Sequence, residues 1–170
     1  MIDSEERVIL VDENDEEIGT AEKLAAHRSG DLHRAFSVFL YNEDGLVLLQ
    51  RRAGTKYHSP GLWSNTCCGH PRPGEDTLAA ASRRLTEELG ISGELQHAST
   101  FRYQATLRDG LVEHEIDHVF TGLASGDPNP DPAEVSEWQW MTIEDVSAWL
   151  AREPGAFTAW FAGVFDRATR

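Results

Sequence analysis

The sequence predicts a single α+β domain over residues 1–170. Runs typical of β-strands follow one another through short turns, and helical patterns are confined to a few segments. The 170 residues and 40% hydrophobic content suffice for one buried core. Repeats and linker-like segments are absent from the sequence. Strands joined mainly by hairpins favour an α+β arrangement over a doubly wound one.

The expected strands cover residues 7–12, 16–21, 34–41, 46–51, 66–69, 99–107, 112–123 and 136–141. The first four form two predicted hairpins, because residues 13–15 and 42–45 are strong turn signals. A polar, histidine-bearing stretch at residues 22–32 separates the hairpins. The loop at residues 52–65 carries Gly and Pro, which punctuate regular structure.

One segment has clear helical periodicity. Asp76 or Thr77 can cap a helix that runs to Leu89, and Gly90 is placed to end it. Leu78, Ser82, Leu85 and Leu89 form its predicted inward stripe. Two further helices are expected near residues 142–151 and 158–168.

The composition of the chain limits the classes of molecule that it is expected to bind. A formal net charge of −14 opposes binding to nucleic acid and to anionic membranes, so a phosphate-bearing ligand needs a local basic patch. The longest apolar run, residues 35–41, is far short of the ~20 residues of a membrane span. The acidic start lacks the features of a secretory signal, which favours the cytoplasm. Adjacent Cys67 and Cys68 fit a reduced compartment better than a disulfide.

A glutamate-bearing loop and helix indicate a possible cation site. Arg84 and Glu88 share one helical face, and the preceding loop could bring Glu75 close to Glu88. Clustered carboxylates suit Mg²⁺, which commonly bridges to substrate phosphates. The alternative is an ordinary surface helix with Arg–Glu pairs.

The spacing of this segment resembles the Nudix box, G-x5-E-x7-R-E-U-x-E-E-x-G-U, where U is bulky and aliphatic. The matching residues are Gly69, Glu75, Arg83, Leu85, Glu87, Glu88, Gly90 and Ile91. The resemblance implies a Nudix fold, with a mixed β-sheet and flanking helices. Arg84 departs from the box, which has a glutamate there. An arginine would weaken a hydrolytic ion cluster and supply donors to phosphate oxygens, which favours holding a diphosphate over cutting it.

Residues 63–71 carry a second, more specific resemblance. Their sequence, WSNTCCGHP, resembles the cysteine motif of type I isopentenyl-diphosphate isomerases. That family converts isopentenyl diphosphate to dimethylallyl diphosphate by adding and removing protons through a tertiary carbocation. The resemblance implies that Cys68 is catalytic, whereas Cys67 is expected to be an inert core residue.

The same resemblance implies a site for one Mn²⁺ or Zn²⁺. Its expected ligands are His27, His33, His70, Glu113 and Glu115. Strand geometry independently puts Glu113 and Glu115 on one face, because residues i and i+2 project to the same side. The remaining histidines match no ligand position: His58, His97, His114 and His118.

The resemblance also implies the other roles. Glu115 is expected to relay a proton with Tyr103, and Trp160 to face the cation. Which of Cys68 and Glu115 donates the proton stays open, with Glu115 and Tyr103 favoured. Mg²⁺ is expected on Glu88, and the residues expected to hold the diphosphate are Lys23, Arg52, Lys56 and Arg84. Trp138, Trp140 and Trp149 are expected in the core.

Two other functions are weighed against this one. A Nudix pyrophosphohydrolase would explain the box but leaves Cys68, Trp160 and the histidines without a role. A silent metal-binding module would tolerate Arg84 but does not need Cys68 and Glu115 together. We therefore expect an isomerase that binds a small diphosphate, acts as a monomer, and binds neither nucleic acid nor membrane.

Overall fold

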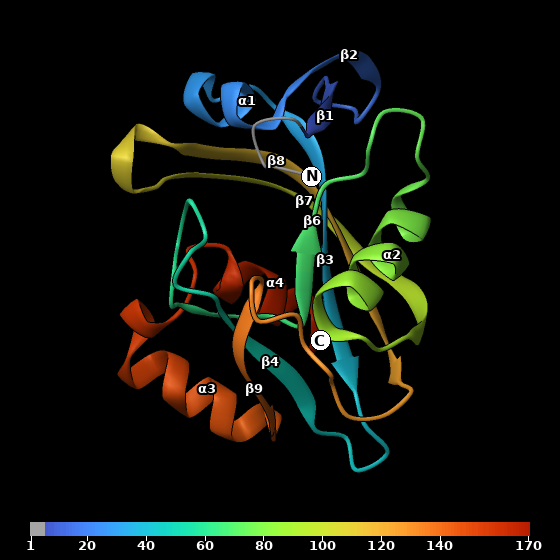
Figure 1. The fold of residues 1–170 in the computed structure, drawn as a ribbon, viewed down its shortest axis with the longest axis vertical. Coiled ribbons are helices and arrows are strands. Elements are labelled where there is room, and N and C mark those ends of the chain that lie inside the picture. Colours follow the sequence, from blue (N-terminus) through green and yellow to red (C-terminus); the bar gives the residue numbers. More distant parts are fainter. Residues whose placement is uncertain (1–5) are drawn as a thin grey trace.

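In the computed structural model, a mixed sheet of nine strands lies at the centre of the fold of residues 6–170 (Figure 1). The structure describes residues 6–170, so the acidic start at residues 1–5 lies outside it. The strands are β1 (Arg7–Val11), β2 (Glu17–Glu22), β3 (His33–Tyr41), β4 (Val47–Arg52), β5 (Trp63–Ser64), β6 (Cys67–Gly69), β7 (Gly93–Thr106), β8 (Val112–Ala124) and β9 (Val135–Met141). The helices are α1 (Lys23–Ser29), α2 (Thr77–Leu89), α3 (Ile143–Arg152) and α4 (Phe161–Ala168), with short 3₁₀ turns at Arg108–Gly110 and Pro154–Ala156.

Strand β3 organises the sheet, and both of its faces are buried. Phe36, Val38 and Leu40 belong to a core under α2, whereas Phe39 belongs to a second core with α4. An apolar run without alternation is what burial on both faces requires. β3 pairs in parallel with β8, and antiparallel with β6 and β1. The mixed sheet with flanking helices matches the predicted fold class.

The second predicted hairpin is largely wrong. β3 and β4 follow each other through the expected turn, but their only register pair is Tyr41 with Val47. β8 lies along one edge of β3, β6 occupies the other edge at Phe36–Val38, and β9 pairs with β4 along its whole length. The two strands therefore diverge into different parts of the sheet. The polar stretch at residues 22–32 also contains a helix, α1, that was not expected.

Helix α2 begins and ends as predicted, but its inward face differs. The Asp76 side chain accepts a hydrogen bond from the Ala79 amide, and Gly90 ends the helix with φ of 61°. Leu78 is 41% exposed and Ser82 is exposed too, whereas Ala80 and Ala81 are buried, so the inward face is rotated from the predicted stripe in the first half of the helix. Leu85 and Leu89 are buried as expected. Among residues 6–170, no helix is long and apolar enough to span a bilayer.

Candidate active site

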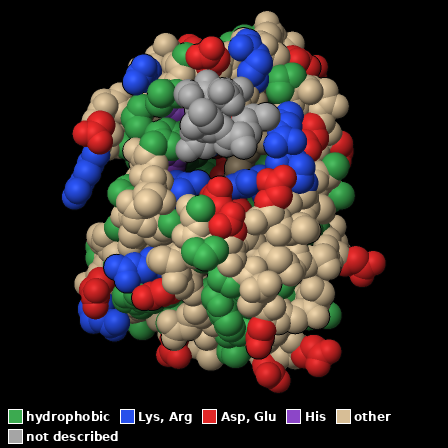
Figure 2. Space-filling model, viewed as in Figure 1, with side chains coloured by type: hydrophobic (Ala, Val, Ile, Leu, Met, Phe, Trp, Pro, Cys, Tyr) green, Lys and Arg blue, Asp and Glu red, His purple; other side chains and the backbone are tan. Residues whose placement is uncertain are grey.

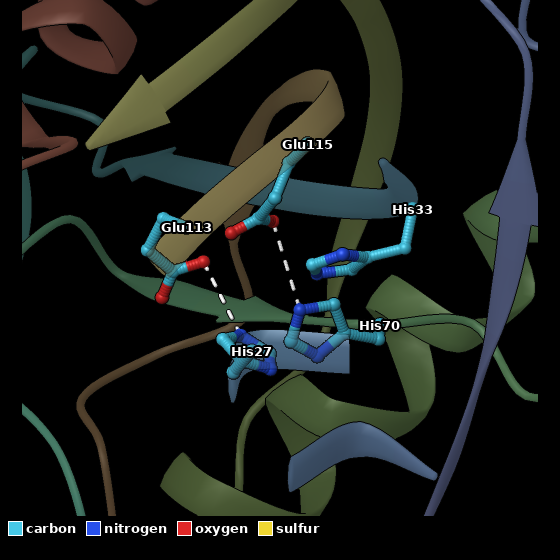
Figure 3. A group of neighbouring side chains, drawn as sticks. All are labelled: His27, His33, His70, Glu113 and Glu115. Carbon is cyan, nitrogen blue, oxygen red and sulfur yellow. Dashed lines mark ion pairs between the residues drawn. The ribbon is translucent and has the colours of Figure 1, made fainter. Parts of the chain in front are cut away.

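Five side chains from four parts of the fold converge on one point. His27 lies on α1, His33 begins β3, His70 follows β6, and Glu113 and Glu115 lie on β8. One ligand atom from each lies within 4.8 Å of all the others. The imidazoles and carboxylates point toward a common centre (Figure 3). Glu113 and Glu115 share a strand face as expected, and His33 is the register partner of Glu115.

The donor set fits a transition-metal ion. The Nδ1 atoms of His27 and His33 lie 2.7 and 2.8 Å from the carbonyl oxygens of Lys23 and Asp31. A carbonyl can only accept, so each Nδ1 carries the proton and each Nε2 keeps a lone pair for an ion. Within the described chain, the buried Nε2 atoms of His27, His33 and His70 and the Oε2 atom of Glu113 have no hydrogen-bond partner.

The ionisation of these groups is also suited to a cation. Burial lowers the pKa of His33 to about 4 and lowers that of His70 well below its usual range. Burial, followed by the nearby Glu113 carboxylate, raises the pKa of Glu115 far above normal. His33 and His70 are therefore neutral, as metal ligands must be, and the Glu113 carboxylate disfavours a second negative charge on Glu115 unless a cation lies between them.

A pocket beside this cluster collects most of the other expected site residues. Its lining includes Lys23, Arg52, Lys56, Cys68, His70, Glu88, Glu113, Glu115 and Trp160. Tyr103 does not line the pocket, but it is the register partner of Glu115 on β7. Its hydroxyl is buried without a hydrogen-bond partner in the described chain. Burial and the neighbouring carboxylates Glu113 and Glu115 raise the pKa of Tyr103, so its phenol stays protonated.

The two cysteines lie in different environments. Cys67 is fully buried in the core under α2, and its sulfur contacts Glu88 at 3.5 Å. Cys68 points to the other side of β6, as neighbouring strand residues do, and lines the pocket. Its Sγ donates a hydrogen bond to the Asn65 side-chain oxygen at 3.4 Å. Burial raises the pKa of Cys68 to about 12, so it is a thiol at neutral pH.

The basic side chains of the pocket form the local patch that an anionic ligand needs. On the face shown in Figure 2, lysine and arginine side chains gather around a hollow. Lys23, Arg52 and Lys56 line the pocket, despite the overall acidity of the chain. The buried Nε of Arg52 has no hydrogen-bond partner in the described chain, and its guanidinium lies 5.5 Å from the Trp160 ring.

The charged side chains of the Nudix-like loop and helix pair differently from the prediction. Glu75 is bound by Arg83 at 2.8 Å and not brought to Glu88. Arg84 lies outside the pocket lining and pairs with Glu88 at 3.0 Å, as well as with Glu87 and Glu134. Glu88 is 6% exposed and lines the pocket. Arg83 and Arg84 both pair with Glu87, but Arg83 also pairs with Glu75, whereas Arg84 also pairs with Glu88.

Two features were missed from the sequence. His58, expected to be ordinary, is 8% exposed, with its Nε2 3.6 Å from Glu113 and its ring 5.8 Å from that of Trp160. It also lines an adjoining cleft of about 600 Å³. Asn65 is fully buried next to Cys68 and Trp160. Asn65 lies within the cysteine motif, so the sequence held a signal for it, but His58 lies in a loop without any such signal.

The fold defines a Nudix protein with a candidate metal-binding cluster and a pocket-lining thiol, and comparison with known proteins agrees on the Nudix fold. The NUDIX domain model matches residues 31–161. The fold is similar to a crystal structure from Deinococcus radiodurans, with a TM-score of 0.75, 23% identity, and coverage of 97% of this chain and 100% of that one. A MutT NUDIX hydrolase from Burkholderia pseudomallei is similar with a TM-score of 0.59 and 22% identity, over 79% of this chain and 98% of that one.

Sequence relatives are more specific. The chain is 57% identical to an isopentenyl-diphosphate Delta-isomerase of Streptomyces griseus, over 94% of this chain and 81% of the relative. It is 52% identical to one of Serratia proteamaculans, over 94% of this chain and 89% of the relative. The chain therefore belongs to the isopentenyl-diphosphate Delta-isomerase family.

Proposed function

We propose that this chain converts isopentenyl diphosphate to dimethylallyl diphosphate, a step of isoprenoid biosynthesis. The observation that carries the proposal is one pocket lined by Cys68, Glu115 and Trp160 and flanked by basic side chains. Such a pocket offers two groups for moving protons, an aromatic face for a cation, and charges for a diphosphate. Family membership at about half identity supports it independently.

The proton transfers fall to Cys68 and Glu115. They come from different strands, β6 and β8, and both face the pocket, as isomerisation across a flat five-carbon unit requires. We assign the donor role to Glu115 with Tyr103, because burial and the neighbouring Glu113 carboxylate keep the Glu115 pKa high. The proton enters at the terminal alkene carbon. Cys68 accepts the second proton, from the carbon beside the cationic centre, as a thiolate that becomes a thiol. Because burial raises its pKa to about 12, its own proton must leave before this step.

The carbocation formed between these steps needs a dry, electron-rich surface. Trp160 is 6% exposed and lines the pocket. A desolvated contact between a cation and an aromatic face contributes about 2 kcal/mol or more. The indole therefore offsets part of the free energy needed to form the carbocation. Exclusion of water prevents water from adding to the carbocation.

His27, His33, His70, Glu113 and Glu115 would hold one Mn²⁺ or Zn²⁺, which would supply positive charge between the two carboxylates. Glu88 would hold Mg²⁺, which would supply positive charge to offset that of the diphosphate. Lys23, Arg52, Lys56 and Arg84 would bind the phosphate oxygens. For Arg84 this requires exchanging one of its present carboxylate partners for a phosphate. We also propose that residues 1–170 act as one domain, as a monomer, in the cytoplasm.

The test is incubation of the purified protein with isopentenyl diphosphate and Mg²⁺ in deuterated water. Products are followed by NMR, and released phosphate is measured in parallel. Dimethylallyl diphosphate carrying deuterium, without phosphate release, is the expected result. Unchanged isopentenyl diphosphate together with hydrolysis of nucleotide diphosphates would instead support a Nudix pyrophosphohydrolase.

A further inference from the structure

The Asn65 side chain joins two groups of the proposed reaction. Its Oδ1 atom accepts hydrogen bonds from the Cys68 thiol at 3.4 Å and from the Trp160 indole Nε1 at 3.2 Å. Ser64 Oγ donates to the same oxygen at 2.9 Å. A single fully buried carbonyl oxygen thus contacts the thiol, the indole and a hydroxyl.

The orientation of this amide is fixed from its other end. Asn65 Nδ2 donates to the carbonyl oxygens of Cys67 at 2.8 Å and Val38 at 3.2 Å. Both partners can only accept, so the nitrogen must face them and the oxygen must face Cys68 and Trp160. The donor side of Asn65 is therefore tied to the sheet, and its acceptor side to the pocket.

Ser64 and Thr158 extend the network. The Trp160 Nε1–H also points to Ser64 Oγ at 3.2 Å, and Thr158 Oγ1 donates to Ser64 Oγ at 3.3 Å. Trp160 precedes α4 and Cys68 lies on β6, and this network joins the two parts of the fold beside the backbone hydrogen bond from the Thr158 amide to the Trp63 carbonyl. Buried, connected hydrogen bonds of this kind hold side chains in one arrangement.

We infer that Asn65 is a positioning residue for the isomerisation: its amide oxygen sets the thiol of Cys68 and the ring of Trp160 relative to each other. Ser64 supports it in the same role. The inference rests on the proposed function. Displacing a reacting group by about 1 Å can cost on the order of 100-fold in rate, whereas the basic groups that bind the diphosphate would be untouched. Asn65 substitution should therefore lower kcat and leave KM nearly unchanged.

The experiment compares Asn65→Ala and Ser64→Ala with wild type in the full chain loaded with metal. Folding is checked by circular dichroism and by bound metal. We expect Asn65→Ala to lower kcat about 100-fold, by analogy with other misplaced groups. Ser64→Ala removes hydrogen bonds without touching Asn65 Nδ2 and should lower kcat roughly 5- to 10-fold. KM should change less than about threefold in both, because diphosphate binding dominates it.

Thr66→Val is the matched control. Thr66 is also fully buried, and its hydroxyl bonds the Leu40 amide and the Leu48 carbonyl, with no bond to Cys68 or Trp160. It should lose stability like the other variants but keep the wild-type kcat. A comparable fall of kcat in Thr66→Val would show general damage to the fold and overturn the inference.

A double-mutant cycle with Trp160→Phe separates positioning from simple destabilisation. If Asn65 acts through the indole, the combined loss of kcat is smaller than the product of the single losses, by about fivefold or more. If Asn65→Ala does not fold, the same cycle is made with Ser64→Ala. Losses that multiply in the cycle, or a wild-type kcat in Ser64→Ala, overturn the inference. A wild-type protein that does not isomerise at all would instead refute the proposed function.

Discussion

His33 lies directly opposite Glu115 in the parallel pairing of β3 with β8. This register brings an imidazole from the start of one strand to a carboxylate in the other. His70 then approaches Glu115 from the end of β6, with its Nε2 3.6 Å from Oε2. Three members of the cluster, His33, Glu113 and Glu115, therefore lie on strands of the central sheet, which hold them more rigidly than loops would.

Metal binding should stabilise the fold as well as support activity. We expect chelation to abolish isomerisation, and Mn²⁺ or Zn²⁺ to restore it and raise the melting temperature. At a free ion concentration of 100 times Kd, the gain is about 2.7 kcal/mol. Thermal melts with increasing ion provide the measurement, and His33→Ala should abolish the shift. Full activity after thorough demetallation would refute the metal assignment.

The adjacent cysteines should respond in opposite ways. Cys68→Ala should abolish isomerisation with little change in stability, because the thiol faces the pocket. Cys67→Ala should leave kcat near wild type but lower the free energy of unfolding by about 1 kcal/mol, since it leaves a small gap in the core. Turnover assays and denaturant melts of both variants distinguish these effects. Isomerisation by the Cys68→Ala protein would refute the proposed mechanism.

Glu115→Gln should abolish isomerisation while the fold survives. The amide is nearly the same shape but cannot exchange a proton with the substrate, and it removes the repulsion with Glu113. Deuterium incorporation into unreacted isopentenyl diphosphate is the measurement, and none is expected. Incorporation at the wild-type rate would show that another residue moves the proton.

His58→Ala should weaken metal binding although His58 was not among the expected ligands. Its Nε2 lies 3.6 Å from Glu113 Oε1, whereas His27 contacts the other oxygen, Oε2. Residues that orient a ligand typically contribute 10- to 100-fold in metal affinity. Competition with a chromophoric chelator measures the change, and His97→Ala, on the exposed outer surface of β7, serves as the control. Equal affinity in the two variants would count against this role.

Features that depend on neighbouring residues, such as helix ends and strand faces, could be predicted from the sequence. The meeting of residues from distant segments could not. Asp76 and Gly90 bound α2 as expected because capping depends on a few neighbouring residues. Strand alternation predicted that Glu113 and Glu115 share a face. The histidines were assigned through family resemblance, since no periodicity in the sequence brings α1, β3 and β6 together. His58 was missed because its contact with Glu113 depends on the path of an irregular loop.

The pairing of Glu75 with Arg83 should make the free energy of unfolding depend on pH in the acidic range. The hydrogen bond from Arg83 is the main cause that lowers the Glu75 pKa below its ordinary 4.5. A lowered pKa in the folded state means that the stabilisation is present above the unfolded-state pKa and is lost as pH falls through the folded value. Glu75→Gln should therefore cost about 0.5 kcal/mol at pH 7, because solvent screens this partly exposed Arg–carboxylate pair. As pH falls from the unfolded-state pKa through the lowered pKa of the folded state, wild type and variant should converge, because the carboxyl becomes protonated in both states of the wild type. Urea melts at pH 7, 5 and 3.5 measure this difference; a constant gap across the series would mean that the charge of Glu75 contributes nothing.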